Sequence, residues 1–287
     1  MNLGNKDMTG KIFEDELVRH TLEEDIGSGD VTSQATIPAS LTGTGRIFTR
    51  QAGIVAGTEI TRSVFRTMDP DLKIKVDYQD GSKADINEVV MVIIGSIRSI
   101  LSAERVALNF LGHLSGIATL TGKFVELVQG TRTRIIDTRK TTPMLRRLEK
   151  AAVAAGGGFN HRMGLYDMVL IKDNHVQAAG GISQAAGKAE AYLHRQEKKL
   201  KIEVESRTLD EVRAALGCNV QRIMLDNMTI PEIREAVKLI NRQVEVEVSG
   251  GVNLENVHEI ALCGVDFISV GAITHSAPAF DFSLLID

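Results

Sequence analysis

The amino-acid sequence predicts an α/β protein in which a small N-terminal domain precedes a (β/α) barrel, complete or incomplete. The 287 residues are enough for two domains of unequal size, each with an apolar core. After residue 130, six short runs rich in β-branched residues alternate with helical patterns, as in a parallel sheet. The last four runs begin 21 to 23 residues apart, which favours a repeated strand–helix unit. An open doubly wound sheet is the alternative, but no G-x-G-x-x-G motif opens the first helix.

The N-terminal domain is expected to span residues 13–115, after a flexible tail at residues 1–12. It begins with a helix, because Phe13, Leu17 and Val18 keep a helical period. Further strands are expected at 45–49, 53–56, 72–76 and 89–94, with helices at 58–67 and 97–113.

The barrel is expected to span residues 116–287. Its strands are predicted at 134–138, 168–172, 201–205, 222–226, 244–250 and 267–271. Helices are predicted between them at 142–155, 182–197, 208–216, 230–241 and 253–262.

Composition and charge exclude several classes of function. The net charge of −4 and pI of about 6.0 disfavour nucleic acid and anionic membranes as partners. The N-terminal stretch lacks the apolar core of a secretory signal, and the longest apolar run, residues 89–94, is too short to cross a bilayer. Two isolated cysteines, Cys218 and Cys263, fit a reducing compartment, so we expect a cytoplasmic protein.

Every predicted barrel strand ends in polar, charged or glycine residues. The ends are Asp137–Lys140, Lys172–His175, Glu205, Asp226–Asn227, Ser249–Gly251 and Gly271–Ala272. The carboxyl ends of barrel strands meet on one face, where active sites lie, so these side chains predict a single site.

The last two strand ends predict a phosphate-binding site. Small residues at 249–251 and 271–272 let backbone N–H groups approach an anion, and Ser249 and His275 add side-chain donors. The alternative is that the glycines only close tight turns.

Cations gather where the first barrel strand meets its helix. Residues 132–175 carry nine Lys or Arg against four acids, although the chain as a whole is acidic. Arg139 and Lys140 precede a helix start that we place at Thr142, as N-cap, and Pro143. An arginine and a lysine at this position suit a carboxylate and a phosphate, respectively. The other basic residues of this helix, Arg146, Arg147 and Lys150, are expected to form a solvated face.

Glu205 and Asp226 end adjacent strands, and three roles are open to them. They could share a Mg²⁺ that carries a pyrophosphate, or stabilise positive charge on a sugar carbon. They could also form ion pairs with Lys140 or Lys172, which would be a structural role.

Several stretches of the chain resemble quinolinate phosphoribosyltransferase, also called nicotinate-nucleotide pyrophosphorylase (carboxylating). They are AERVALNFL (103–111), SGIAT (115–119), DTRKTTP (137–143), GGGFNHRMGLYDMVLIKDNH (156–175), IEVE (202–205), IMLDN (223–227), SGGV (249–252) and GVDFISVGAITHS (264–276). The resemblance runs from about residue 13 to the C-terminus. Two departures from the family's pattern, Gly112–His113 and an asparagine where a glycine is expected at residue 87, lie in or beside the small domain.

The resemblance implies an N-terminal α/β sandwich domain, a C-terminal incomplete (β/α) barrel and a homodimer. It implies that quinolinate and phosphoribosyl pyrophosphate give nicotinate mononucleotide, pyrophosphate and CO₂, with Mg²⁺, in NAD biosynthesis. Arg105 would complete the site of the partner subunit.

Carried over by motif, the resemblance also implies residue roles. Quinolinate would be held by Arg105, Thr138, Arg139, His161 and Arg162. The catalytic residues would be Lys140, Lys172, Glu205 and Asp226, the last two also holding the metal. The phosphoribosyl group and its phosphates would be held by Lys140, Lys172, Ser249, Gly250, Gly251, Val270, Gly271, Ala272 and His275.

Three other functions stay open at this point. A paralogous group that accompanies molybdate transport has a different acceptor, although the intact TRKTTP and NHR motifs favour the quinolinate enzyme. Lys140 or Lys172 in a barrel mouth could instead form a Schiff base, as in aldolases. A non-catalytic phosphosugar-binding protein would bind ligand without releasing CO₂.

Overall fold

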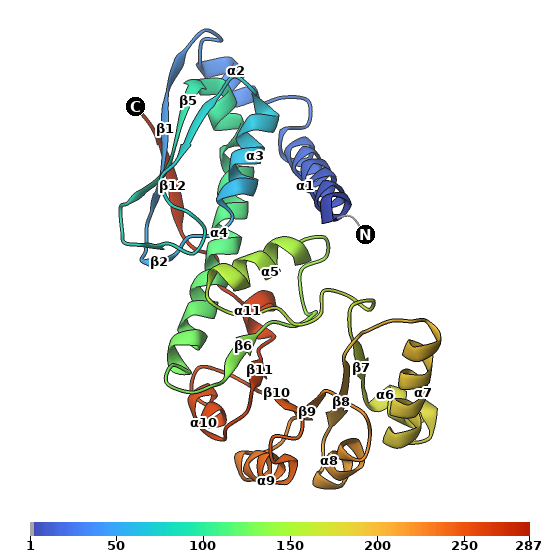
Figure 1. The fold of residues 1–287 in the computed structure, drawn as a ribbon. Helices are drawn as coiled ribbons and strands as arrows, with labels where there is room; N and C mark the ends of the chain where they lie inside the picture. The colour runs from blue at the N-terminus through green and yellow to red at the C-terminus, as the bar shows by residue number, and fades with distance from the viewer. Residues whose placement is uncertain (1–2) are drawn as a thin grey trace. The chain divides into compact units, whose positions relative to one another are not determined.

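The computed structural model describes residues 3–287, with side chains from residue 13 onward, and divides into two compact units (Figure 1). One unit contains the residues up to Thr119 together with Pro278–Asp287, and the other contains Leu120–Ala277. The last ten residues, which we assigned to the barrel, therefore belong to the first unit.

The first unit is built on an antiparallel sheet with the strand order β12-β1-β5-β3. Its strands are β1 (Thr42–Thr49), β3 (Lys73–Val76), β5 (Val89–Ser96) and β12 (Phe282–Ile286). A separate pair joins β2 (Gly53–Ile54) to β4 (Lys83–Ala84). The helices are α1 (Leu3–Ile26), α2 (Val31–Thr36), α3 (Thr58–Met68) and the first part of α4 (Ile97–Leu127).

The described part of the expected N-terminal tail is helical. Residues 3–12 form the first turns of α1, and residues 1–2 lie outside the described residues. Extending an existing helix adds one hydrogen bond for each residue that is fixed, so polar turns can continue a helix that an apolar face has nucleated.

The structure explains why two residues that depart from the family's pattern, Asn87 and Gly112, suit their positions. Asn87 adopts a left-handed φ of 67°, which glycine and asparagine tolerate best. Gly112 lies on α4 against Phe280, whose N–H donates to the Gly112 carbonyl at 2.9 Å. A Cβ at Gly112 would lie 2.8 Å from the Phe280 carbonyl oxygen, so the glycine permits this close approach.

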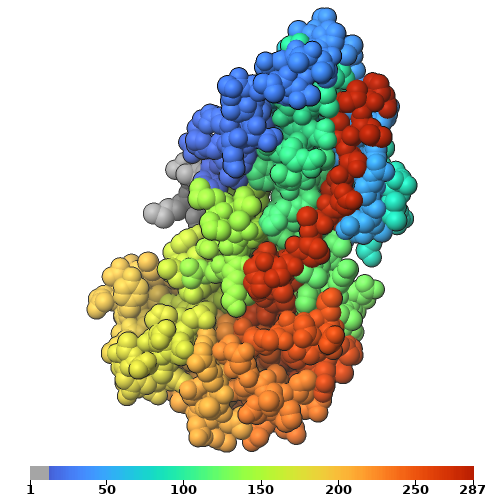
Figure 2. Space-filling model, turned by 180° about the vertical axis from the view of Figure 1, so that it is seen from behind, coloured from blue at the N-terminus to red at the C-terminus, as the bar shows by residue number. Residues whose placement is uncertain are grey.

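The C-terminal strand β12 completes the sheet of the first unit. It pairs with β1 from Gly45↔Ile286 to Thr49↔Phe282. In the space-filling view the last residues, in red, run along blue and green residues of this unit (Figure 2). The sequence gives no local sign of this pairing, because the partner strand lies more than 230 positions away.

The second unit is an incomplete (β/α) barrel. Its six parallel strands are β6 (Arg134–Ile136), β7 (Val169–Ile171), β8 (Ile202–Ser206), β9 (Arg222–Asp226), β10 (Glu245–Ser249) and β11 (Phe267–Ser269). They follow the order β6-β11-β10-β9-β8-β7, which leaves β6 and β7 as open edges. The open edge of β6 is partly covered by Phe159, whose N–H donates to the Ile135 carbonyl at 2.8 Å.

Each barrel strand is followed by one or two helices, which lie outside the sheet (Figure 1). They are α5 (Arg146–Ala155), α6 (Asp173–Ala179), α7 (Ile182–Arg195), α8 (Leu209–Leu216), α9 (Ile230–Ile240), α10 (Val257–Leu262) and α11 (Ala272–His275). Side-chain caps start two of them directly after strand ends: Thr208 caps α8, and Thr229 with Glu232 forms a capping box on α9.

The helix after β6 begins later than expected, at Arg146 with Leu145 as N-cap. Met144 adopts a left-handed φ of 69°, which an α-helix cannot include, so Thr142 and Pro143 lie in the preceding turn. The N–H of Thr142 donates to the carboxylate of the buried Glu149. This turn places Arg139 and Lys140 at the mouth of the barrel.

Two further helices differ from expectation. Helix α4 continues to Leu127, because Leu114, Ile117 and Ala118 extend its buried stripe. Helix α6, directly after β7, was not expected. No helix in the described part of the chain combines the length and apolar character that a bilayer crossing requires.

Candidate active site

A cavity of about 720 Å³ opens at the carboxyl ends of the barrel strands. This volume is typical of a small-molecule site. The predicted site residues that line it are Thr138, Arg139, Lys140, His161, Arg162, Lys172, Glu205, Asp226, Ser249, Gly250, Gly251, Gly271, Ala272 and His275.

Two predicted residues lie elsewhere. Val270 is buried in the core, and its N–H continues the sheet by donating to the Ile136 carbonyl at 2.9 Å. Arg105 is an exposed residue of α4 in the first unit.

Glycines at the ends of β10 and β11 shape one side of the cavity. Gly250 and Gly251 adopt φ values of 93° and 64°, and a Cβ at Gly250 would lie 2.2 Å from Asn227 Oδ1. A Cβ at Gly271 would lie 3.1 Å from His275 Nε2 and 3.2 Å from Lys140 Cδ. Backbone and donor side chains therefore come close together here, which is the arrangement that binds a phosphate.

Carboxylates and cations gather next to this region, where Asp226 is paired in register with Ser249. We call the three carboxylates, Asp173, Glu205 and Asp226, the acidic corner. Lys172 Nζ lies 2.6 Å from Glu205 Oε2, so an ion pair, one of the three roles left open for Glu205, is present in the structure. Arg207 contacts all three carboxylates of the corner. Asn227 donates to Asp226 Oδ2 at 2.9 Å.

Three cationic side chains, Arg139, Lys140 and Arg162, form a further wall of the cavity beside β6 and β7. Arg162 NH1 donates to the Met168 carbonyl at 3.2 Å, which holds its side chain beside β7. Burial and the nearby Arg139 lower the pKa of Arg162, because both disfavour another positive charge. Arg139, Lys140 and Arg162 therefore form a concentrated positive field that suits a multiply charged anion.

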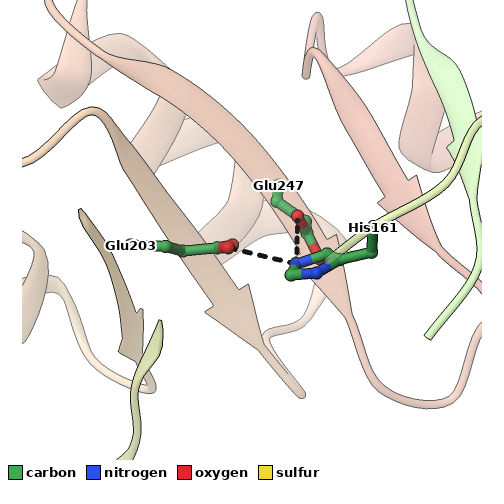
Figure 3. Close-up of side chains that lie close together, drawn as sticks. All are labelled: His161, Glu203 and Glu247. Carbon is green, nitrogen blue, oxygen red and sulfur yellow. Dashed lines mark hydrogen bonds and ion pairs between the residues drawn. The ribbon is translucent and has the colours of Figure 1, made fainter. Parts of the chain in front are cut away.

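His161 lies between two buried glutamates inside the barrel (Figure 3). Its Nε2 is 3.1 Å from Glu203 Oε2 and 3.5 Å from Glu247 Oε2. Arg222 donates to the same Glu247 oxygen at 2.8 Å. On the other edge of the ring, the N–H of Arg162 donates to His161 Nδ1 at 2.7 Å.

The pKa values of this network follow from burial and mutual charge. Burial alone would lower the pKa of His161, but hydrogen bonds and charge from Glu203 and Glu247 raise it to about 9. The Arg162 N–H donates to His161 Nδ1 and therefore disfavours a proton on that nitrogen. Burial and the charge of Glu247 raise the pKa of Glu203 to about 7. Burial would also raise the pKa of Glu247, but His161 and Arg222 lower it.

The same three side chains are close enough to hold a metal ion, but their surroundings disfavour one. Their ligand atoms all lie within 4.8 Å of one another. Arg222, however, already donates to Glu247 Oε2 and brings a positive charge beside the cluster, which opposes a second cation there. The arrangement suits a charge-balanced hydrogen-bond network that orients His161.

A second buried network fixes the loop that carries His161 and Arg162. Asp137 and Lys150 are fully buried and form a direct ion pair. Lys150 Nζ also donates to the His161 carbonyl at 3.1 Å, and the His161 N–H donates to Asp137 Oδ1 at 2.8 Å. Burial lowers the pKa of Lys150 and raises that of Asp137, against their mutual attraction. The expectation that Lys150 belongs to a solvated face is therefore wrong.

Comparison with known proteins agrees with this geometry. The family model for the quinolinate phosphoribosyl transferase N-terminal domain matches residues 30–115, and the model for the C-terminal domain matches residues 117–285. The chain belongs to the quinolinate phosphoribosyltransferase family.

Named relatives match almost the whole chain. A Nicotiana tabacum protein named quinolinate phosphoribosyltransferase [decarboxylating] 2b, mitochondrial, is 43% identical over 95% of this chain and 82% of its own length. A Synechocystis protein named probable nicotinate-nucleotide pyrophosphorylase [carboxylating] is 41% identical over 96% of this chain and 93% of its own. The structure of nicotinate-nucleotide pyrophosphorylase from Francisella tularensis has 40% identity and a TM-score of 0.90, with 96% of each chain covered.

Three residues of the candidate site of this quinolinate phosphoribosyltransferase family member were missed in the sequence. Glu203 and Glu247 alternate with apolar residues in IEVES and EVEVS, a pattern that also describes a half-exposed strand. Because β8 and β10 are buried on both faces, these glutamates point into the barrel instead. Arg207 follows its strand by one residue and carried no distinguishing signal.

Proposed function

We propose that this chain transfers a phosphoribosyl group to quinolinate and releases pyrophosphate and CO₂, giving nicotinate mononucleotide for NAD biosynthesis. One observation carries the proposal: a single cavity joins a glycine-lined phosphate site, a cationic wall and an acidic corner. Quinolinate has two carboxylates, and the sugar donor has a phosphate and a pyrophosphate. The cationic wall suits the two carboxylates of quinolinate, and the glycine-lined site suits the phosphate of the donor. The acidic corner suits a metal ion that carries the pyrophosphate.

The positions of the side chains support the binding roles that we propose. Arg139 and Arg162 hold the dicarboxylate, with His161 and Thr138 beside them. The glycines at 250–251 and 271, with Ser249, Ala272 and His275, hold the 5′-phosphate. Lys140 lies next to Gly271 and so reaches the donor from the phosphate side.

The first chemical step forms a bond between the quinolinate nitrogen and the anomeric carbon. The bond from that carbon to the pyrophosphate oxygen breaks, and its electron pair leaves with pyrophosphate. Glu205 and Asp226 lie where negative charge stabilises the developing sugar cation. Lys172, paired with Glu205, offsets charge on the departing pyrophosphate.

In the second step the pyridinium ring loses the carboxylate next to its nitrogen as CO₂. The electron pair of the broken carbon–carbon bond stays on the ring carbon beside the positive nitrogen, and a proton from water then occupies that carbon. No general base is required, because the site positions reactants and neutralises charge.

Mg²⁺ fits the acidic corner by the chemistry of its donors. The metal prefers one or two carboxylates together with phosphate oxygens, and Glu205 and Asp226 end adjacent strands. Both Glu205 oxygens already contact Lys172 or Arg207, so Asp226 would be the easier ligand to engage. When bound, the metal would neutralise the pyrophosphate.

The proposal includes a homodimer in which Arg105 completes the site of the partner subunit. Arg105 supports this role because it is an exposed cation on α4, within the AER stretch that carries the resemblance. It also includes a cytoplasmic location. Relatives of this chain carry names that place them in mitochondria or chloroplasts as well.

A Schiff-base reaction is less well supported. Lys172 Nζ is already engaged by Glu205 Oε2 at 2.6 Å, and a nucleophilic lysine would have to leave this contact to attack a carbonyl group.

The test is turnover of quinolinate with phosphoribosyl pyrophosphate and Mg²⁺, measured beside nicotinate as the competing acceptor. We expect turnover with quinolinate only. Arg139→Ala should abolish it, whereas Arg234→Ala, which changes an exposed arginine on the outer helix α9, should not. Turnover with nicotinate alone, or no turnover in a folded protein that still binds the sugar donor, would refute the substrate assignment and favour the molybdate-associated paralogue.

A further inference from the structure

Arg207 joins all three carboxylates of the acidic corner. Its guanidinium lies 3.0 Å from Asp173 Oδ2, 3.3 Å from Glu205 Oε1 and 3.4 Å from Asp226 Oδ2. These carboxylates lie at the ends of three different strands. Among the described residues that line the cavity, Arg207 is the one side chain whose ion pairs include all three.

The backbone of Arg207 is fixed although its side chain is half exposed. Its N–H donates to Glu211 Oε2 at 2.5 Å, and Thr208 caps the helix that begins directly after it. The side chain is 51% exposed and faces the cavity. An isolated surface ion pair contributes little, but here three convergent carboxylates share one guanidinium.

The charges of the corner depend on this residue. Three carboxylates face two cations, Arg207 and Lys172, and Lys172 contacts Glu205 alone among the three. Without Arg207, Asp173 and Asp226 would keep no cationic partner among the ion pairs of the described residues. A divalent cation and a guanidinium would compete for these same oxygens.

We propose that Arg207 is an internal counter-cation that occupies the acidic corner until the sugar donor brings Mg²⁺ with it. This inference rests on the proposed function, because it takes the corner to be the metal site. Free Mg²⁺ gains too little to displace the guanidinium from three carboxylates. The donor's pyrophosphate supplies further negative charge, which lets the metal enter and gives Arg207 a new anionic partner.

Metal binding without substrate tests the inference directly. Mn²⁺ serves as the probe, because its free form gives an electron paramagnetic resonance signal that is lost on binding. With no sugar donor present, we expect Arg207→Ala to bind Mn²⁺ about tenfold more tightly than the unchanged protein. Arg207→Lys, which keeps a charge but cannot span the corner, should lie between the two.

Two further variants make the result specific. Arg213→Ala removes an exposed arginine from the next helix, where its partner is Asp210, and should leave Mn²⁺ affinity unchanged. Adding Asp226→Asn to Arg207→Ala should abolish the gain. If Arg207→Ala binds Mn²⁺ no more tightly than Arg213→Ala, or if the gain survives Asp226→Asn, the inference is overturned. Neither result affects the proposed reaction, which is tested by turnover of the unchanged protein.

Discussion

Replacing Lys150 by methionine should destabilise the barrel and loosen the binding of quinolinate. Methionine fills a similar volume but leaves Asp137 buried without its cationic partner. Removing one member of a buried ion pair costs about 3–5 kcal/mol, because the remaining charge is not compensated. Asp137 keeps two donors, the His161 N–H on Oδ1 at 2.8 Å and the Asn160 side-chain amide on Oδ2 at 2.7 Å. We therefore expect a value near 3 kcal/mol, at the low end of this range.

Urea denaturation measures this loss, and quinolinate kinetics measure its effect on the site. Lys150 also donates to the His161 carbonyl, so its loss should raise the KM for quinolinate more than the KM for the sugar donor. The double variant Lys150→Met with Asp137→Asn removes the orphaned charge and should recover part of the lost stability. A loss below about 1 kcal/mol in the single variant would refute the reasoning, since it would place the pair in a well-solvated environment.

Two further predictions concern the phosphate site and the histidine network. Gly250→Ala should raise the KM for phosphoribosyl pyrophosphate about tenfold, because its Cβ would collide with Asn227, whereas Gly187→Ala, in open space on α7, should change neither KM nor kcat. Equal kinetics for the two variants would contradict the proposed cradle. The stability that His161 contributes should be fully present below pH 6.5 and lost as the pH rises through about 9, since its pKa is raised in the folded state. Between pH 6 and pH 9.5, the free energy of unfolding in urea should therefore fall by about 3 kcal/mol in the unchanged protein, and this fall should be absent in His161→Gln. Parallel pH profiles for the two proteins would refute the prediction.

The barrel and most of its site could be predicted from the sequence because strand periodicity and strand-end chemistry are local signals. Arg139, Lys172 and Asp226 each follow an apolar run, and the parallel topology alone brings such positions to one face. The start of α5 was missed because a left-handed Met144 overrides the favourable N-cap sequence of Thr142 and Pro143.

Other features depend on contacts between distant segments, which periodicity does not report. Lys150 is buried because it pairs with Asp137, which lies outside the helix that carries Lys150. The sequence of that helix alone resembles one with an ordinary charged face. Glu203 is an interior residue because both faces of its strand are covered, and the sequence of the strand does not reveal this. The contacts of Arg207 with three carboxylates could not be predicted, because only the fold brings these carboxylates together from separate strands.

The pairing of β12 with β1 has a consequence for the order in which this protein can fold during synthesis. The barrel segment, Leu120–Ala277, is inserted between two parts of the first unit. A ribosome therefore synthesises all the barrel strands before it makes Phe282–Ile286, and until then one edge of β1 has no partner. Strands β1, β3 and β5 leave the ribosome long before β12, so the sheet of the first unit is completed only at the end of synthesis. A nascent chain stalled shortly before Phe282 should thus expose an unpaired strand edge, which is a substrate for chaperones and a risk for aggregation.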